Sequence, residues 1–187
     1  MSLPAADALP DGEQLLRLEA GARAGGSGLE AASLQGRWRF HQVWPRRGGA
    51  PQAAAAALLR GLDASLEIGA ATAAGLPLLN RVALGALELR FEGEGRLAGR
   101  RPLLRFWFCR WQLRLAGRPL IERPLARPEE RRLPFFALIG RGRTAAGETW
   151  LAARGRGGGV ALWLLDPSGS ATSGTTASEA SLAGGER

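Results

Sequence analysis

Apolar and polar residues alternate along much of the chain, which is the pattern of strands that bury one face. Because successive side chains of a strand point to opposite faces, a period of two predicts a half-buried strand. Residues 34–44 show this period most clearly. Their apolar face holds Leu34, Gly36, Trp38, Phe40 and Trp44, with Gln42 as the exception, and their polar face holds Gln35, Arg37, Arg39 and His41.

The longest predicted strand covers residues 103–115. Its odd positions from Trp107 onward are all apolar, whereas its even positions change from apolar to polar at Arg110. Cys109 lies between two tryptophans on the apolar face and is predicted to be buried. A strand longer than the common five or six residues, with large rings along one side, is typical of a small closed barrel around a pocket.

Other short strands follow with turn signals between them, which favours an antiparallel barrel or sandwich. Residues 71–79 carry no clear pattern. The further predicted strands cover residues 65–70, 87–97, 120–122, 135–139, 148–154 and 160–165.

Helical signals precede the first strand and follow it. Asp11 can cap a helix that begins at Gly12, and a short turn is predicted over residues 29–33. Residues 52–62 are rich in alanine with leucines at helical spacing, so they predict a second helix. The fold class expected is therefore mainly β: an antiparallel lipocalin-like β-barrel over residues 34–166, a helical N-terminal extension over 1–33 and a disordered, Ser/Thr/Gly-rich tail over 167–187.

Charge is concentrated in the predicted barrel. All 25 basic residues are arginine and the formal net charge is +8, but residues 36–166 alone hold 22 arginines against ten acidic residues. The absence of lysine indicates the codon bias of a high-GC genome and carries no function. A basic surface attracts anionic lipid, acidic protein or nucleic acid without choosing among them.

The sequence also limits compartment and chemistry. A single cysteine excludes an intramolecular disulfide and a multi-cysteine metal site, which fits a reducing compartment. No apolar run approaches the roughly 18 residues of a membrane span, and the N-terminus lacks the pattern of a signal peptide. We therefore expect a cytoplasmic protein, at most peripheral at a membrane.

Catalytic motifs find little support. His41 is the only histidine, lies on the polar face and is not accompanied by a Gly-x-Ser-x-Gly elbow. Glu92 and Glu94 share a strand face but belong to a run of exposed charges. Gly140 and Gly142 resemble part of a dinucleotide-binding motif, but the strand that follows leaves no room for the long helix that such a site needs. We predict no catalytic residue, no metal site and no cofactor.

The remaining candidate site is a wall of aromatic side chains. In a packed core these rings are filling, whereas in a barrel of about eight strands the interior can hold one small apolar ligand. Both interpretations stay open at this point. The predicted ligand-binding residues are Trp38, Phe40, Phe91, Trp107 and Trp111.

Two segments resemble a known family. The Gly36-Arg37-Trp38 opening resembles the Gly-x-Trp strand of lipocalin-like barrels, and residues 150–165, with Arg154-Gly155 and a glycine pair before an apolar strand, are similar to the C-terminal hairpin of the plastid-lipid-associated proteins, the fibrillins. The resemblance implies that Trp38 lies at the closed end of the barrel near a late-strand arginine, which by position is Arg154. It further implies a cyanobacterial or plastid protein that binds a carotenoid, quinone or lipid near thylakoid membranes.

Two alternatives remain. The lyases that attach bilin pigments to phycobiliproteins share the barrel scaffold and would make this an enzyme-like chromophore carrier. A basic RNA- or protein-interaction module with a filled core is the third hypothesis, although no specific nucleic acid is predicted. The expected partners are a small apolar ligand and an anionic membrane surface.

Overall fold

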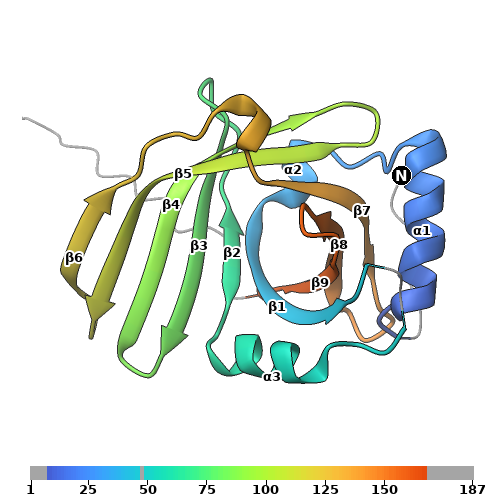
Figure 1. The fold of residues 1–187 in the computed structure, drawn as a ribbon. Coiled ribbons are helices and arrows are strands. Elements are labelled where there is room, and N and C mark those ends of the chain that lie inside the picture. The colour runs from blue at the N-terminus through green and yellow to red at the C-terminus, as the bar shows by residue number, and fades with distance from the viewer. Residues whose placement is uncertain (1–7, 47–48, 168–187) are drawn as a thin grey trace, which may run out of the picture.

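The computed structural model describes residues 8–46 and 49–167, so the predicted tail lies outside the described residues except for Pro167. The described part is mainly β, with helices before and after the first strand (Figure 1). The helices are α1 (Gly12–Gly25), α2 (Ala31–Leu34) and α3 (Ala53–Gly61), with a 3-10 turn η1 (Glu130–Arg132). The strands are β1 (Gly36–Trp44), β2 (Ser65–Ile68), β3 (Leu76–Leu84), β4 (Leu87–Ala98), β5 (Leu103–Leu115), β6 (Arg118–Pro124), β7 (Phe135–Arg143), β8 (Thr149–Gly155) and β9 (Val160–Leu165).

The sheet closes on itself through β5. Strands pair in the order β4-β3-β2-β1-β9-β8-β7-β5-β6, and the further pairing of β4 with β5 completes a ring of eight antiparallel strands. Residues 103–105 of β5 pair with β7, whereas its second half pairs with β6. The far halves of β3, β4 and β5 therefore leave the ring and form a flat extension with β6 (Figure 1). The predicted antiparallel, lipocalin-like barrel is confirmed.

A bulge in β5 corrects the predicted faces of this strand. Glu92 pairs with Arg110 and Gly93 with Phe108, which leaves Cys109 as an extra residue between them. Such an insertion exchanges the faces of all following side chains. Phe106 and Phe108 before the bulge and Trp111 after it consequently share the inner face. Cys109 itself is exposed rather than buried, and its Sγ lies 3.4 Å from the Glu92 carbonyl oxygen.

A second bulge corrects the prediction for β1. The register shifts between Phe40 and Gln42, so His41 is the extra residue. Phe40 pairs with Trp163 on the inner face, whereas Trp44 turns outward and packs against Leu15 of α1. The apparent exception at Gln42 is thus the start of the second half of the strand with its faces exchanged.

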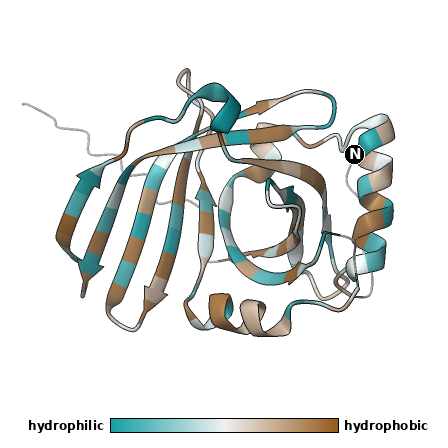
Figure 2. Ribbon diagram, viewed as in Figure 1, coloured by the Kyte–Doolittle hydropathy of each residue, from teal (hydrophilic) through white to brown (hydrophobic). Residues whose placement is uncertain are grey.

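Two apolar clusters lie on opposite sides of the barrel wall. The inner cluster surrounds Trp38, and Leu34 of α2 packs into it, so the predicted short turn covers this part of the interior. The outer cluster joins β1, β7, β8 and β9 to Leu15 of α1. Since β9 is buried on both faces, it is an uninterrupted apolar run. Leu15 and Ala22 of α1 are buried, so the apolar side of this helix faces the barrel, and hydropathy colouring shows brown and teal segments along the strands of the sheet extension (Figure 2).

Local signals at the helix termini agree with the structure. The Asp11 side chain accepts a hydrogen bond from the Gln14 N–H, and the Gln14 side chain accepts one from the Asp11 N–H, which completes a capping box. Of the helices in the described ranges, none is long and apolar enough to cross a bilayer.

Candidate functional site

An apolar cavity of about 420 Å³ lies inside the barrel, beside α3. Its volume falls within the usual range for sites that hold a small molecule. None of its described lining residues is charged, and Ser65 and Asn80 are the polar ones. The lining residues are Phe40, Leu59, Ala64, Ser65, Leu66, Leu78, Asn80, Val82, Phe106, Phe108, Pro134, Phe136 and Trp163.

The aromatic residues of this cavity form a continuous chain of ring contacts. Phe106 stacks on Phe136 with their centroids 5.1 Å apart, and Phe136 meets Trp163 edge to face at 5.4 Å. Trp163 in turn contacts Phe40, and Phe106 continues the chain to Phe108 and then to Phe91. Each edge-to-face or offset contact holds its rings in a defined orientation. These contacts form a continuous aromatic wall along the cavity.

The structure separates the five predicted ligand residues. Phe40 lines the cavity, and Phe91 stands at the end of the ring chain through its contact with Phe108. Trp38 is completely buried in the inner cluster and does not line the cavity. Trp111 shares the inner face with Phe91 but lies beyond the cavity.

Trp107 faces the outside of the barrel instead. The guanidinium carbon of Arg127 lies 3.8 Å from the Trp107 ring centroid, and that of Arg96 lies 5.7 Å away. The tryptophan is buried beneath these cations rather than beside a cavity.

Four cavity rings were not predicted as site residues. Simple alternation puts Phe106 and Phe108 on the outer face, because it does not allow for the bulge at Cys109. The signal of the bulge is that the even positions of residues 103–115 change from apolar to polar at Arg110. Phe136 and Trp163 fall in correctly predicted strands, but no local pattern distinguishes a cavity residue from a core residue.

The Gly-x-Trp segment has a clear structural role. Gly36 has φ +125°, a backbone conformation that L side chains rarely adopt, and an added Cβ would lie 2.6 Å from the Leu165 Cδ1, so a larger residue would strain this position. The Trp38 Nε1 donates to the Leu34 carbonyl oxygen at 2.6 Å. The guanidinium near the Trp38 ring belongs to Arg141, at 6.0 Å, and not to Arg154 as the resemblance implied.

Arg154 lies on the outer face of the barrel, next to α1. Its Nε donates to the Glu19 Oε1 at 2.7 Å, and its Nη2 donates to Oε2 of the same carboxylate. Arg23 and Arg101 bind Oε1 as well, with Nη2 distances of 2.8 and 2.7 Å. Gly155 follows at the end of β8 and pairs with Phe136. The carboxylate thus joins α1, the turn before β5 and β8.

Glu19 stays ionised well into the acidic range. Burial by itself raises the pKa of this carboxyl group, but hydrogen bonds from Arg154 and Arg23, together with their positive charges, outweigh it. The net effect lowers the pKa of Glu19 from 4.5 to about 2. The ion pair is therefore intact at neutral pH.

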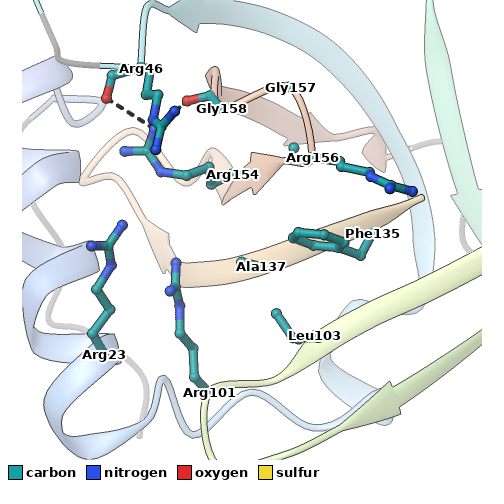
Figure 3. A pocket seen from close by; sticks show the side chains of 11 residues that line it. Arg23, Arg46, Arg101, Leu103, Phe135, Ala137, Arg154, Arg156, Gly157 and Gly158 are labelled. Atoms are coloured by element: carbon teal, nitrogen blue, oxygen red, sulfur yellow. Dashed lines mark hydrogen bonds between the residues drawn. The ribbon is translucent and has the colours of Figure 1, made fainter. Parts of the chain in front are cut away.

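A second, basic cavity of about 580 Å³ opens above this ion pair. Arg23, Arg101 and Arg154 point toward a common space, while Arg156 extends away from it (Figure 3). Phe135 and Ala137 of β7 line this cavity, whereas Phe136, the residue between them, lines the apolar one. One strand therefore separates the two cavities.

Comparison of the chain with protein-family models, with curated proteins and with solved structures finds no significant match. The fibrillin resemblance thus stays a hypothesis. Within residues 8–46 and 49–167, no three His, Cys, Asp or Glu side chains cluster in a way that could hold a metal ion.

Proposed function

We propose that this protein binds one small apolar molecule in the cavity inside the barrel. The observation that carries the proposal is the uncharged cavity of about 420 Å³ with its continuous aromatic wall. Aromatic faces and aliphatic side chains favour a planar or elongated hydrocarbon, and Asn80 can orient one polar end of it. A carotenoid, quinone or lipid, the ligands that the resemblance implies, fits this chemistry.

The test is a titration with the apolar fluorescent probe N-phenyl-1-naphthylamine. Val82 lines the cavity, whereas the next residue, Ala83, pairs with Glu88 on the charged outer face of the same strand. Val82→Trp fills the cavity and is expected to weaken probe binding at least about tenfold, the effect of losing about 1.4 kcal/mol of binding free energy. Ala83→Trp adds the same ring outside the barrel and serves as the matched control.

Three outcomes contradict the proposal. The wild-type protein fails to bind the probe saturably, both variants bind it like the wild type, or both lose it equally. Salt-sensitive retention on RNA without probe binding would favour the basic interaction module instead. Covalent transfer of a bound bilin to an apo-phycobiliprotein would favour the lyase-like alternative.

We further propose that the sheet extension docks on an anionic bilayer. The β3–β4 and β5–β6 turns lie side by side, because the Ala116 N–H donates to the Ala86 carbonyl oxygen at 2.8 Å. The tip of the sheet extension, formed by these two turns and the start of β6, carries four exposed leucines. Arg118 adds a positive charge there. The leucines and their exposed fractions are Leu84 (64%), Leu87 (41%), Leu115 (46%) and Leu120 (57%).

The position of the tips relative to the cavity supports a bilayer as the partner. Val82 lines the cavity and Leu84, two residues along β3, shares its face, so an apolar surface runs from the cavity to the tip. Arg118 and Arg123 on β6 are exposed and form no ion pair with a described residue, so they suit lipid phosphates. An apolar ligand could then pass between the bilayer and the barrel without crossing water.

Sedimentation with phosphatidylcholine vesicles, with and without phosphatidylglycerol, tests this docking. The double variant Leu84→Ser and Leu120→Ser is expected to lower binding to anionic vesicles about tenfold, because two exposed leucines no longer enter the bilayer. Leu125→Ser removes an exposed leucine beyond the end of β6 and is the control. Equal binding by the double variant and the control would refute the tip as the membrane surface.

A further inference from the structure

The basic cavity is lined by five arginines that come from four separate segments of the chain. Arg23 comes from α1 and Arg101 from the turn before β5, whereas Arg154 ends β8. The loop after β1 contributes Arg46, and the β8–β9 turn contributes Arg156. None of the described residues that line the cavity is acidic. Like charges brought together in this way repel one another unless counter-charge is present.

Among the described residues, one carboxylate pairs with the arginines of this cavity. Glu19, beneath the cavity, already accepts hydrogen bonds from Arg23, Arg101 and Arg154. Arg156 donates to the Leu133 carbonyl oxygen at 3.2 Å and to neighbouring carbonyls, which satisfy its N–H groups but do not neutralise its charge. Because Arg156 points away, four guanidinium groups, those of Arg23, Arg46, Arg101 and Arg154, stand around one carboxylate and leave an excess of three positive charges.

Donors remain available at the cavity. The Arg46 side chain forms no ion pair or hydrogen bond with any described residue, although its carbonyl oxygen accepts from Arg154. The Arg101 Nε is buried and has no partner among the described residues. The rest of the lining is small or apolar, including Ala137, Gly157 and Gly158, so a ligand of several atoms has room.

We propose that this cavity binds a phosphate group. Guanidinium forks match the oxygens of phosphate in geometry, and such charge-assisted hydrogen bonds are stronger than neutral ones. A dianionic phosphate monoester suits this threefold positive excess better than a single carboxylate. The inward convergence of the side chains fits one compact anion, whereas a nucleic-acid strand is bound along an extended basic groove. This site is independent of the apolar cavity.

Isothermal titration of the full chain with inorganic phosphate tests the proposal. The wild type is expected to bind one phosphate, and Arg46→Gln is expected to weaken binding about tenfold. Arg46 is exposed and its side chain has no partner among the described residues, so its replacement leaves the fold unchanged. Arg101→Gln removes the Nε that has no partner there and is expected to weaken binding as well. Arg17→Gln, at an exposed position of α1 outside the cavity lining, is the control and should stay within about twofold of the wild type.

Vesicles that contain phosphatidic acid identify the source of the phosphate. Saturable, Arg46-dependent binding of free phosphate supports a soluble phosphate ester, and Arg46-dependent binding of these vesicles alone supports a lipid headgroup. Absence of both, or equal weakening by Arg46→Gln and Arg17→Gln, would overturn the proposal. Probe binding in the barrel should be the same in all three variants, so a failure here is distinguishable from a failure of the ligand proposal.

Discussion

Glu19→Gln is expected to lower the free energy of unfolding at pH 7 by about 3–5 kcal/mol, the usual effect of removing one member of a buried ion pair. Glu19 is 2% exposed and is the counter-charge for Arg23, Arg101 and Arg154. The amide leaves these guanidinium groups without a carboxylate. Urea denaturation measures the loss. Glu13→Gln, at an exposed position of the same helix, is the control and should change stability by less than about 0.5 kcal/mol.

The stability lost in Glu19→Gln is expected to depend on pH. Because folding lowers the pKa of Glu19 to about 2, its ion pair stabilises the protein fully above the ordinary pKa of 4.5. That contribution, about 3 kcal/mol for a shift of this size, is lost as the pH falls from 4.5 toward 2. The stability difference between the wild type and Glu19→Gln should therefore shrink over this interval. A difference that stays constant from pH 7 to pH 3 would show that the carboxylate charge does not hold α1 to the barrel.

Trp38→Ala is expected to destabilise the protein by about 3–5 kcal/mol, the range for removing a large buried aromatic side chain. Trp38 is fully buried, and the variant would leave a cavity beside Leu34 and lose the hydrogen bond to its carbonyl oxygen. Trp38→Phe keeps most of the packing and should lose only about 1–2 kcal/mol. Chemical denaturation of both variants gives the two values.

Trp38→Phe also separates the structural role of this residue from the predicted ligand-binding one. Since Trp38 does not line the apolar cavity, the affinity of Trp38→Phe for the naphthylamine probe should stay within about twofold of the wild type. If Trp38→Phe lowered the affinity for the probe as much as Val82→Trp does, Trp38 would belong to the ligand site, as the sequence predicted.

The arrangement divides the molecule into two chemically different surfaces. The inner side of β7 presents Phe136 to the apolar cavity, and its outer side presents Phe135 and Ala137 to the arginine cavity. The β3–β4 and β5–β6 turns lie beyond the ring (Figure 1), and Leu84 and Leu87 in the first of them pair with each other. An apolar guest and a phosphate group would consequently bind on opposite sides of one sheet, each without competing for the other's contacts.

The sequence by itself located eight of the nine strands that the structure describes and predicted that they form an antiparallel barrel, but it did not predict β3. Alternation is a local property of the chain, so β4, β8 and β9 could be located from their own residues. The cap at Asp11 was equally local, because its partner Gln14 is three residues away. Residues 71–79 stayed unassigned because Leu76, Pro77 and Leu78 interrupt the period of β3.

Only the tertiary structure decided which side chains share a face and which distant groups meet. One extra residue at Cys109 exchanged the faces of β5, so that Trp107 faces outward and Phe106 and Phe108 face inward. Because such a bulge is stabilised by pairing with a neighbouring strand, its position depends on contacts far along the chain. The ion pair of Glu19 with Arg154 spans 135 residues. No local pattern encodes a contact of that range, since closure of the sheet is what brings α1 and β8 together.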